Sequence, residues 1–295
     1  MRNYLLVLKR RIRQCDMKKY ISLCIVLAYV LVGCDAHSAD NSDTTYDTKS
    51  RFSIGEDKQI VFAPGNLQYH PQNKQWRFAP AQYECIGLHN SQTSNTYNGW
   101  IDLFGWGTGS SPVTTSVQYS DYANFVDWGE NKIGEDDPNV WRTLTKVEWE
   151  YLLHSRTHAP FLKGIAKVGN TNGLIMLPDM CWLLVDTITG GLMVDGVRFR
   201  YGLSDMLGDS CYEEYQAFSI EEWSKLEAIG AIFLPAAGSR FGLNVRDEMA
   251  CGGYWSATGY SAHHAYYITF NSREAGVASY YRDYGRSVRL VKDLK

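Results

Sequence analysis

Short runs of apolar and polar residues, separated by turn residues, dominate the chain after residue 50. The runs RFSIG and QIVFA flank Glu56-Asp57-Lys58, and the runs NLQYH and QWRFA flank Pro71–Lys74. Each pair predicts a β-hairpin, because strand-forming residues on both sides of a polar turn favour antiparallel pairing. Between the two hairpins, Pro64-Gly65 should break or bulge the strand.

The C-terminal part of the chain has the same strand pattern. A short apolar run at 231–235 precedes a long connection at 236–253, and the four runs after it predict strands at 254–258, 264–271, 276–283 and 287–292. Alternation along a strand places Tyr266, Ile268 and Phe270 on one face of their strand. Val288 and Leu290 share a face of the last strand in the same way.

Residues 143–153, TLTKVEWEYLL, predict an amphipathic helix. Thr145 and Glu148 form a capping-box pattern, in which the hydroxyl accepts a backbone N–H and the carboxylate reaches back to the cap. Leu144 and Trp149 flank the cap as a hydrophobic staple, and the expected apolar face consists of Val147, Trp149, Tyr151, Leu152 and Leu153. We therefore interpret Glu148 as a helix cap and not as a catalytic carboxylate.

A second helix with the same signature is predicted at 219–230. Ser219 and Glu222 form its capping box, Trp223 occupies the position equivalent to Trp149, and Gly230 ends it. Two short helices within a chain of strands and loops indicate an α+β fold.

Residues 86–140 lack a regular pattern and contain the steps Trp106-Gly107 and Trp128-Gly129. A loop region of this length inside a domain needs either a function or internal packing. Aromatic residues make up 14% of the chain, with 20 Tyr and 9 Trp. We expect the region to be packed by its own aromatic side chains.

The N-terminal segment is typical of a secretory signal. Lys18 and Lys19 precede the apolar run Tyr20–Gly33, which at 14 residues is shorter than the about 20 needed to cross a bilayer. The run ends in LVGC, which resembles the lipobox of bacterial lipoproteins. The resemblance implies cleavage before Cys34 and lipid attachment to its sulfur. A buried hydrophobic helix with an incidental cysteine is the alternative interpretation.

The boundaries of the mature protein follow from this signal. Residues 1–33 form the expected signal peptide, with Met17 as an alternative start to Met1. Residues 34–50, which begin with the lipidated cysteine, are polar and rich in Asp, and they predict a disordered tether. A single domain is expected over 51–295.

Removal of the signal changes the charge of the protein. The whole chain has a formal net charge of −3, and residues 1–33 hold seven Lys or Arg and one Asp, so the remainder carries −9. This negative charge argues against electrostatic binding of the protein to nucleic acid or to anionic membranes. We expect the protein to be attached to the membrane by its lipid anchor instead.

The cysteines leave their redox state open. Besides Cys34, the mature chain contains Cys85, Cys181, Cys211 and Cys251. Four cysteines allow three disulfide pairings, and buried free thiols are an equal alternative. Their spacings of 96, 30 and 40 residues match no zinc-knuckle pattern.

Metal and nucleotide signals in the sequence are weak. His154 and His158 are four residues apart, but Pro160 ends a helix near them, and no third ligand is close in sequence. His263 and His264 open a strand and should point to opposite faces. The sequence contains no phosphate-binding Gly loop, no nucleophile elbow and no metalloprotease helix. We therefore expect no cofactor.

Several strings resemble known families. WRTLTKVEWEYLL is similar to a helix of the formylglycine-generating-enzyme family. FAPGNLQY, WRFAPAQYE, GWIDLFGWGT, LPAAGSR, GYWSAT and GRSVRLV resemble, in the same order, lipoproteins of gut Bacteroidetes that carry the Fibrobacter major paralogous domain. This resemblance covers about residues 51–292. It implies a C-type-lectin-like fold with antiparallel strands, two short helices and long loops.

The resemblance also bears on activity. The lipoprotein family has no established chemistry to transfer. The enzyme family uses a close pair of cysteines, whereas no two mature cysteines here are nearer than 30 residues. The calcium-dependent lectin site is also poorly matched, because Asp137-Pro138-Asn139 precedes the first helix instead of lying in the long loop.

We therefore expect a non-enzymatic binding or adhesion module, anchored by lipid in the cell envelope at the outer membrane or cell surface, with a glycan or a protein as ligand. A structural or accessory subunit of a surface assembly is the alternative, and an oxidase of the formylglycine-generating type is a remote one. By analogy with the fold, the long loop and the adjoining strand nominate the contact residues Arg240, Asn244, Arg246, Asp247, Glu248 and Trp255. Trp255 is either a contact residue or a core residue.

Overall fold

The computed structural model describes residues 50–186, 190–202 and 216–294, which belong to one compact unit. Strands contain 38% of the residues and helices 18%, and the helices are short. The α+β class predicted from the sequence is confirmed at this level.

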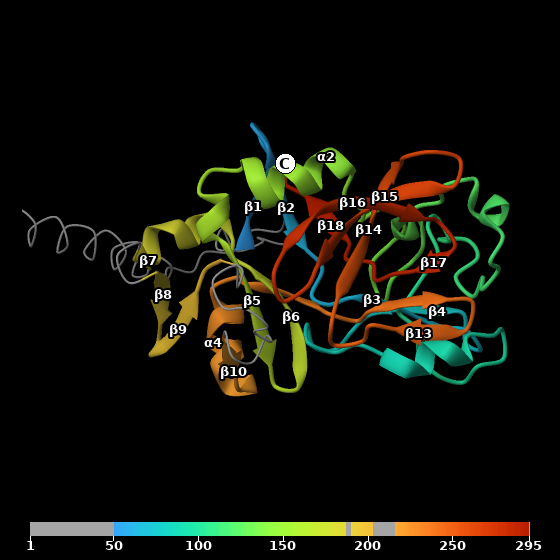
Figure 1. The fold of residues 1–295 in the computed structure, drawn as a ribbon, viewed down its shortest axis with the longest axis horizontal. Helices are drawn as coiled ribbons and strands as arrows, with labels where there is room; N and C mark the ends of the chain where they lie inside the picture. The colour runs from blue at the N-terminus through green and yellow to red at the C-terminus, as the bar shows by residue number, and fades with distance from the viewer. Residues whose placement is uncertain (1–49, 187–189, 203–215, 295) are drawn as a thin grey trace, which may run out of the picture. The chain divides into compact units, whose positions relative to one another are not determined.

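Both N-terminal hairpins are present as predicted. β1 (Phe52–Gly55) pairs with β2 (Lys58–Phe62), and β3 (Leu67–His70) pairs with β4 (Gln75–Phe78). The strand break at Pro64-Gly65 is confirmed by the gap between β2 and β3. β2 also pairs with β18 (Val291–Asp293), so the first hairpin joins the C-terminal end of the chain (Figure 1).

A four-stranded sheet with the order β10-β5-β6-β11 lies between two cores. Alternate residues of its strands face opposite sides, so Ile165 and Leu174 enter one core while Ala166 and Ile175 enter the other. The strands of this sheet are β5 (Lys163–Val168), β6 (Thr171–Met176), β10 (Ala217–Phe218) and β11 (Ile232–Pro235). Of these four strands, only β11 is predicted from the sequence.

A smaller sheet is formed by β7 (Val185–Asp186), β8 (Gly191–Val194) and β9 (Val197–Arg200). Asp195 and Gly196 join β8 to β9 with φ angles of 45° and 81°. Positive φ at both central residues is the requirement of the tight turn whose twist matches a hairpin, and Asp-Gly satisfies it. These three strands are also not among the predicted elements.

The C-terminal sheet consists of β14 (Gly252–Gly259), β15 (His264–Phe270) and β16 (Ala275–Tyr281), which lie side by side in Figure 1. One face of β15 directs Ile268 and Phe270 into the first core, as predicted, with Tyr266 half-buried. The other face directs Ala265 and Tyr267 into a third, aromatic core. The sheet therefore has buried surface on both sides.

The long connection 236–253 contains a hairpin that is not predicted from the sequence. β12 (Ser239–Phe241) pairs with β13 (Asn244–Arg246) and, on its other edge, with β17 (Tyr284–Gly285). The predicted last strand, 287–292, differs from the regular strand that is present, which is β18. Residues 288–290 precede β18 and accept backbone hydrogen bonds from Ala63 and Leu67. Val288 and Leu290 are both buried, as their shared face predicts.

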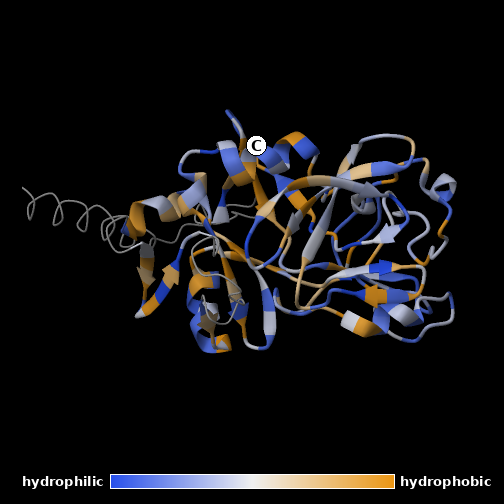
Figure 2. Cartoon of the chain, viewed as in Figure 1, coloured by the Kyte–Doolittle hydropathy of each residue, from blue (hydrophilic) through white to orange (hydrophobic). Residues whose placement is uncertain are grey.

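The first helix begins as predicted. α2 (Lys146–Glu150) has Thr145 as its cap, with the Thr145 and Glu148 side chains bonding each other's backbone N–H, and it continues as a π-helix, η5 (Tyr151–Ser155). Figure 2 shows apolar and polar residues side by side along α2. Val147 is 67% exposed, so its assignment to the apolar face is wrong. Trp149, Leu152 and Leu153 already fill the side of the helix that faces the core.

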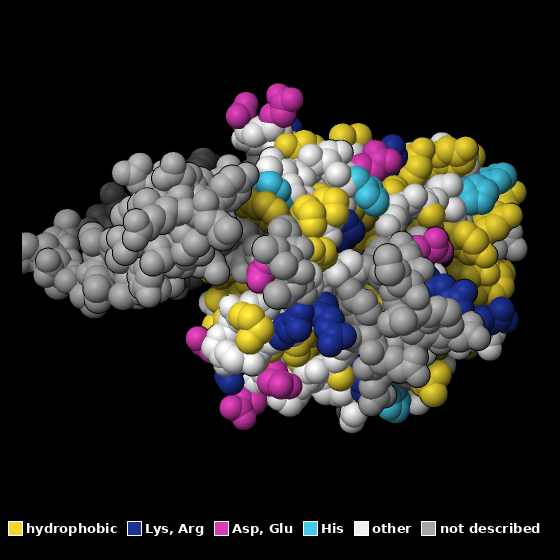
Figure 3. All heavy atoms as spheres, turned by 60° about the vertical axis from the view of Figure 1, so that its left-hand side comes forward, with side chains coloured by type: hydrophobic (Ala, Val, Ile, Leu, Met, Phe, Trp, Pro, Cys, Tyr) yellow, Lys and Arg dark blue, Asp and Glu magenta, His cyan; other side chains and the backbone are white. Residues whose placement is uncertain are grey.

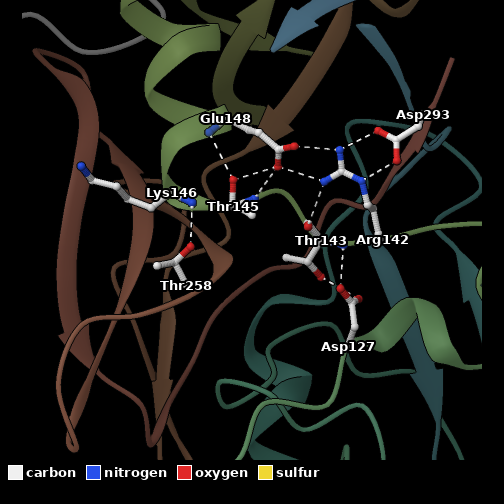
Figure 4. A network of polar contacts seen from close by, with 8 residues as sticks. All are labelled: Asp127, Arg142, Thr143, Thr145, Lys146, Glu148, Thr258 and Asp293. Carbon is white, nitrogen blue, oxygen red and sulfur yellow. Dashed lines mark hydrogen bonds and ion pairs between the residues drawn. The ribbon is translucent and has the colours of Figure 1, made fainter. Parts of the chain in front are cut away.

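Arg142 links α2 to the C-terminal strand β18 through ion pairs with Glu148 and Asp293 (Figure 4). Its Nη1 and Nη2 donate to the two Glu148 oxygens, both at 2.9 Å, and its Nε donates to Asp293 Oδ2 at 2.7 Å. The neighbouring Thr143 donates through its backbone N and its Oγ1 to Asp127, at 3.0 and 2.9 Å. Glu148 thus caps a helix and holds an ion pair, which confirms its structural interpretation.

The second helix, α4 (Ile220–Ala228), also has its predicted capping box, between Ser219 and Glu222. Trp223 and Leu226 are buried in the second core. Gly230 follows the helix with φ 89°, a conformation that suits glycine at a helix end.

Aromatic side chains pack the loop region 86–140 from within, as predicted. Phe104, Trp106 and Trp128 of this region belong to the third core, together with Trp141 and residues of strands β3, β4, β14 and β15. The other helical segments are short: η2 (Gly87–Gln92), η3 (Tyr119–Tyr122), η4 (Trp128–Glu130), η6 (Ala159–Phe161) and η7 (Asp179–Leu184).

Asp102 is a fully buried carboxylate within this loop region. Its oxygens accept hydrogen bonds from the Ile86 backbone N at 2.9 Å and from Asn90 Nδ2 at 2.8 Å. Burial raises the pKa of Asp102 to about 6, and the hydrogen bonds oppose this only in part. Ionised Asp102 is therefore a cost to the fold at neutral pH.

Candidate functional site

A cavity of about 260 Å³ opens between the C-terminal sheet and the hairpin β12–β13. We call it the arginine–tyrosine pocket. Its walls come from the hairpin and the loop after it, from β15 and β16, and from the segment around β17. The lining residues are Gly238, Ser239, Arg246, Asp247, Cys251, Gly252, Tyr267, Thr269, Tyr280, Tyr284 and Arg286.

Strand register brings the pocket's sheet residues together. Tyr267 and Thr269 are two residues apart on β15 and therefore share a face. Tyr280 on β16 lies opposite Ala265, which is on that same face. The face of β15 that packs Ala265 and Tyr267 into the third core therefore also forms the floor of the pocket.

Arg286 is the central side chain of the pocket and is only 8% exposed. Its backbone exchanges two hydrogen bonds with Phe104, both 2.9 Å, so its position is fixed. Its guanidinium carbon lies 3.7 Å from the centroid of Tyr267, 5.2 Å from that of Tyr280 and 5.4 Å from that of Trp255. Such stacking on aromatic faces is favourable for a guanidinium.

Gly253 makes room for this guanidinium on the sheet. A Cβ at Gly253 would lie 2.5 Å from Arg286 Nη1, which is closer than side-chain atoms approach one another. A side chain at position 253 would therefore displace the Arg286 guanidinium.

The Arg286 side chain has no hydrogen-bond or carboxylate partner among the residues that the structure describes, and its buried Nε is unsatisfied. Burial lowers the pKa of Arg286, and its neighbours Tyr267, Tyr280, Tyr284 and Cys251 act in the opposite direction. A buried guanidinium without a partner is costly, since buried charges are normally paired.

Arg282 provides a contrast within the same region. It is also 8% exposed and lies over Trp106, but its guanidinium donates to four backbone carbonyls, those of Tyr122, Ala123, Ser261 and His264. Arg282 therefore has the bonding of a structural arginine, whereas Arg286 keeps its donors free toward a cavity.

The rim of the pocket is set by a tight loop after β13. Asp247 has a φ of 57°, and its carbonyl accepts the Cys251 N–H at 3.0 Å, while Gly238 N–H donates to the Cys251 carbonyl at 2.8 Å. Arg246 and Asp247 are exposed at this rim. With Arg286, the lining holds two arginines and one aspartate, a formal net charge of +1.

Cys251 is the thiol of the pocket. Burial raises its pKa, and Asp247 adds to this, while Arg286 opposes it. The thiol is therefore protonated at neutral pH and is a poor nucleophile. Cys85, Cys181 and Cys251 are all free, and Cys211 lies outside the described residues.

The predicted contact residues divide into three groups. Arg246 and Asp247 line the pocket. Asn244, exposed at the start of β13, and Glu248, which lies against Gly87, are not among the lining residues.

Arg240 departs from its nomination as a contact residue, and Trp255 takes the core position that was one of its two alternatives. Each is only 1% exposed. Arg240 Nη2 donates to the Leu103 carbonyl at 3.1 Å, and Trp255 Nε1 donates to the Phe104 carbonyl at 2.7 Å. Both side chains tie the C-terminal strands to the loop region, so they belong to the core.

The remaining lining residues are not among the predicted ones. Tyr267, Tyr280, Tyr284 and Arg286 reach the pocket from strands that the sequence places only as separate hairpins. One local signal exists, because residues 280–286, YYRDYGR, concentrate tyrosine and arginine.

His154 and His158 have different surroundings. His154 is exposed, and the His158 ring stacks on Trp182, with centroids 3.5 Å apart and planes at 11°. Within residues 50–186, 190–202 and 216–294, no three His, Cys, Asp or Glu side chains are grouped to hold a metal ion.

Charge on the surface is mixed. Figure 3 shows acidic, basic and apolar side chains interspersed on one face. A second, smaller cavity of about 110 Å³ lies between β2 and the C-terminal end of α4, and two of its polar side chains, Glu227 and Gln82, already bond each other. The arginine–tyrosine pocket is therefore the stronger candidate.

The expected signal peptide, Cys34 and all of the tether except Ser50 lie outside the described residues. Over the part of the chain that is described, no helix is long and apolar enough to span a membrane. Comparison with family models, with curated proteins and with solved structures finds no match to this chain.

Proposed function

We propose that this chain is a lipid-anchored cell-envelope protein that acts as a non-enzymatic binding module and takes its ligand in the arginine–tyrosine pocket. The observation that carries the proposal is Arg286, a buried guanidinium whose donors face a cavity without a partner from the described chain. A fold tolerates such a group where a ligand completes its bonding, as at binding sites in general.

A C-type-lectin-like fold is part of the proposal. Its support is the order of elements: two hairpins, α2, α4, β11, a long connection and terminal antiparallel strands, with β18 returning to β2. The sheets β5–β6 and β7–β9 between the two helices are additions to that order. The pocket lies beside the long connection, where ligand contact is expected for this fold by analogy.

The lipid anchor is proposed from the LVGC motif and from the polar, acidic segment that follows it. Incorporation of a labelled fatty acid into the protein, and its loss in Cys34→Ser, would test this part separately. Cys85→Ser, at a cysteine within the folded domain, is the matched control and should retain the label.

Exposed apolar side chains favour a second candidate, an accessory subunit of a surface assembly. Met180 and Leu183 on η7 and Met193 on β8 are 56%, 67% and 58% exposed. Side chains of this kind are enriched at protein–protein contacts. This candidate requires a protein partner and no affinity for glycans.

A glycan-array screen of the purified protein, with and without calcium, discriminates the two candidates. Reproducible binding that is lost in Arg246→Ala or Asp247→Ala supports a ligand in the pocket. A blank array with folded protein contradicts glycan binding and favours the accessory subunit.

A further inference from the structure

We propose that the arginine–tyrosine pocket recognises a carboxylate borne on a pyranose ring, as in a terminal hexuronic acid residue of a glycan, with the carboxylate on Arg286 and the ring against the tyrosines. This inference rests on the proposed function and names the chemical class of its ligand.

The bonding capacity of Arg286 indicates a planar oxyanion. A guanidinium presents parallel N–H groups that match the two oxygens of a carboxylate, and such paired, charge-assisted bonds are stronger than neutral ones. The backbone of Arg286 is held by its bonds to Phe104, and its guanidinium stacks on Tyr267. This stack restricts the guanidinium before a ligand arrives, which lowers the entropic cost of binding.

The charges around the pocket favour a single negative charge. The lining carries a formal net charge of +1, from Arg246, Arg286 and Asp247. A doubly charged phosphate would face Asp247 as well as the arginines. Polyanions are opposed further by the acidic chain as a whole, because residues 34–295 carry a formal net charge of −9.

The walls of the pocket favour a ring over an open chain. Tyr267, Tyr280 and Tyr284 surround Arg286 from two strands and the segment after them. The C–H face of a pyranose is apolar and packs on aromatic rings, while its hydroxyls find polar partners in Thr269 and Asp247. An aspartate or glutamate side chain of a peptide would bring the carboxylate without the ring.

The size of the pocket limits the ligand to about one ring. Its volume of about 260 Å³ lies just below the roughly 300–1,000 Å³ typical of pockets for drug-sized molecules. The remainder of a glycan would therefore extend past Arg246 and Asp247 at the rim, which are exposed.

The test is a calorimetric titration of the purified protein with four probes: methyl β-glucuronide, methyl β-glucoside, N-acetylglutamate amide and inorganic phosphate. We expect the glucuronide to bind, and the other three to bind at least about tenfold more weakly. Arg286→Met should weaken glucuronide binding by about 30-fold or more, because a buried charge partner is lost. Arg286→Lys should also weaken it, since lysine lacks the planar fork.

Two further measurements locate the site. Bound glucuronide should slow labelling of Cys251 by a thiol reagent in wild-type protein, and Cys251→Ser gives the background from the other thiols. Arg246→Ala removes an exposed rim charge and should weaken glucuronide binding severalfold. If Arg286→Met does not fold, the effect of Arg246→Ala on glucuronide binding still tests the inference.

The outcomes separate the inference from the proposed function. Equal binding of glucoside and glucuronide, or tighter binding of N-acetylglutamate amide or phosphate, overturns the inference but leaves a ligand-binding pocket. Glucuronide binding that Arg286→Met and Arg246→Ala leave unchanged also overturns it. If none of the probes binds, the inference fails, and a blank glycan array would then remove the proposed glycan-binding function as well.

Discussion

The guanidinium carbon of Arg286 lies 3.7 Å from the centroid of the Tyr267 ring, and the arginine finds no carboxylate among the described residues. The tyrosine partly compensates the buried charge, since a cation over an aromatic face is attracted by the ring. It offers the guanidinium N–H groups no acceptor. The free hydrogen-bonding capacity of Arg286 toward the pocket is the basis of the functional proposal.

Gly253→Ala should disturb the pocket with little effect on the fold. The new methyl group would meet Arg286 Nη1 at 2.5 Å, and this flexible end of the side chain can shift. Ligand binding should weaken while the melting temperature changes little, as measured by titration and by thermal unfolding.

Gly276→Ala is the matched control for this change. It adds a methyl group to the same sheet at a position with nothing within 4 Å. Equal binding by the two alanine variants would contradict the role given to Gly253.

Glu148→Ala should lower the free energy of unfolding by about 1–3 kcal/mol, because the helix cap and both bonds to Arg142 are lost. The control is Glu150→Ala on the same helix, whose carboxylate only pairs with Lys146 at the surface, and it should change stability by about 0.5 kcal/mol or less. Denaturant unfolding measures both variants. Equal losses would show that the bonds of Glu148 to Arg142 and Thr145 add nothing.

The same carboxylate gives a pH dependence. Burial would raise the pKa of Glu148, but hydrogen bonds from Arg142 and Thr145 outweigh this and hold the pKa below its ordinary value of 4.5. A carboxyl with a lowered pKa stabilises the fold above that value, and the contribution is lost as pH falls through the folded pKa. Glu148→Ala should therefore flatten the fall in stability below about pH 4.5.

Asp102 should act with the opposite sign. Its pKa is raised from 3.8 to about 6 by burial, so the folded protein binds its proton more tightly than the unfolded chain. The resulting stability is present below pH 3.8 and is lost as pH rises through about 6. Asp102→Asn should reduce the loss of stability between these values, measured by unfolding at pH 4.5, 5.5 and 7.5. An unchanged profile would exclude Asp102 as its source.

The sequence predicts elements whose signals are local. The capping boxes at Thr145 and Ser219 are complete within four residues, and the first two hairpins are marked by polar turns. The apolar pattern alone allows a broad face, and it therefore places Val147 on the wrong side of its helix. Asp195-Gly196 is a strong hairpin signal for β8 and β9, although neither strand is among the predicted elements.

The pocket was harder to predict because it depends on distant pairings. Arg246 and Asp247 could be nominated from the long loop alone. Arg286 joins them only because β17 pairs with β12, about 45 residues away in sequence. Nothing in the local sequence distinguishes Arg286 from Arg282, although the Arg286 guanidinium has no hydrogen-bond partner among the described residues and the Arg282 guanidinium donates to four carbonyls.

The most direct test of a ligand-binding role for Arg286 is to compare Arg286→Met with Arg282→Met in thermal and denaturant unfolding without ligand. If Arg286 serves a ligand, Arg286→Met should leave the free energy of unfolding unchanged or raise it, because an unpaired buried charge is removed. Arg282→Met should lower it by about 2–4 kcal/mol, because four carbonyls lose their donor. A loss in Arg286→Met as large as that in Arg282→Met would make Arg286 a structural residue and contradict the account.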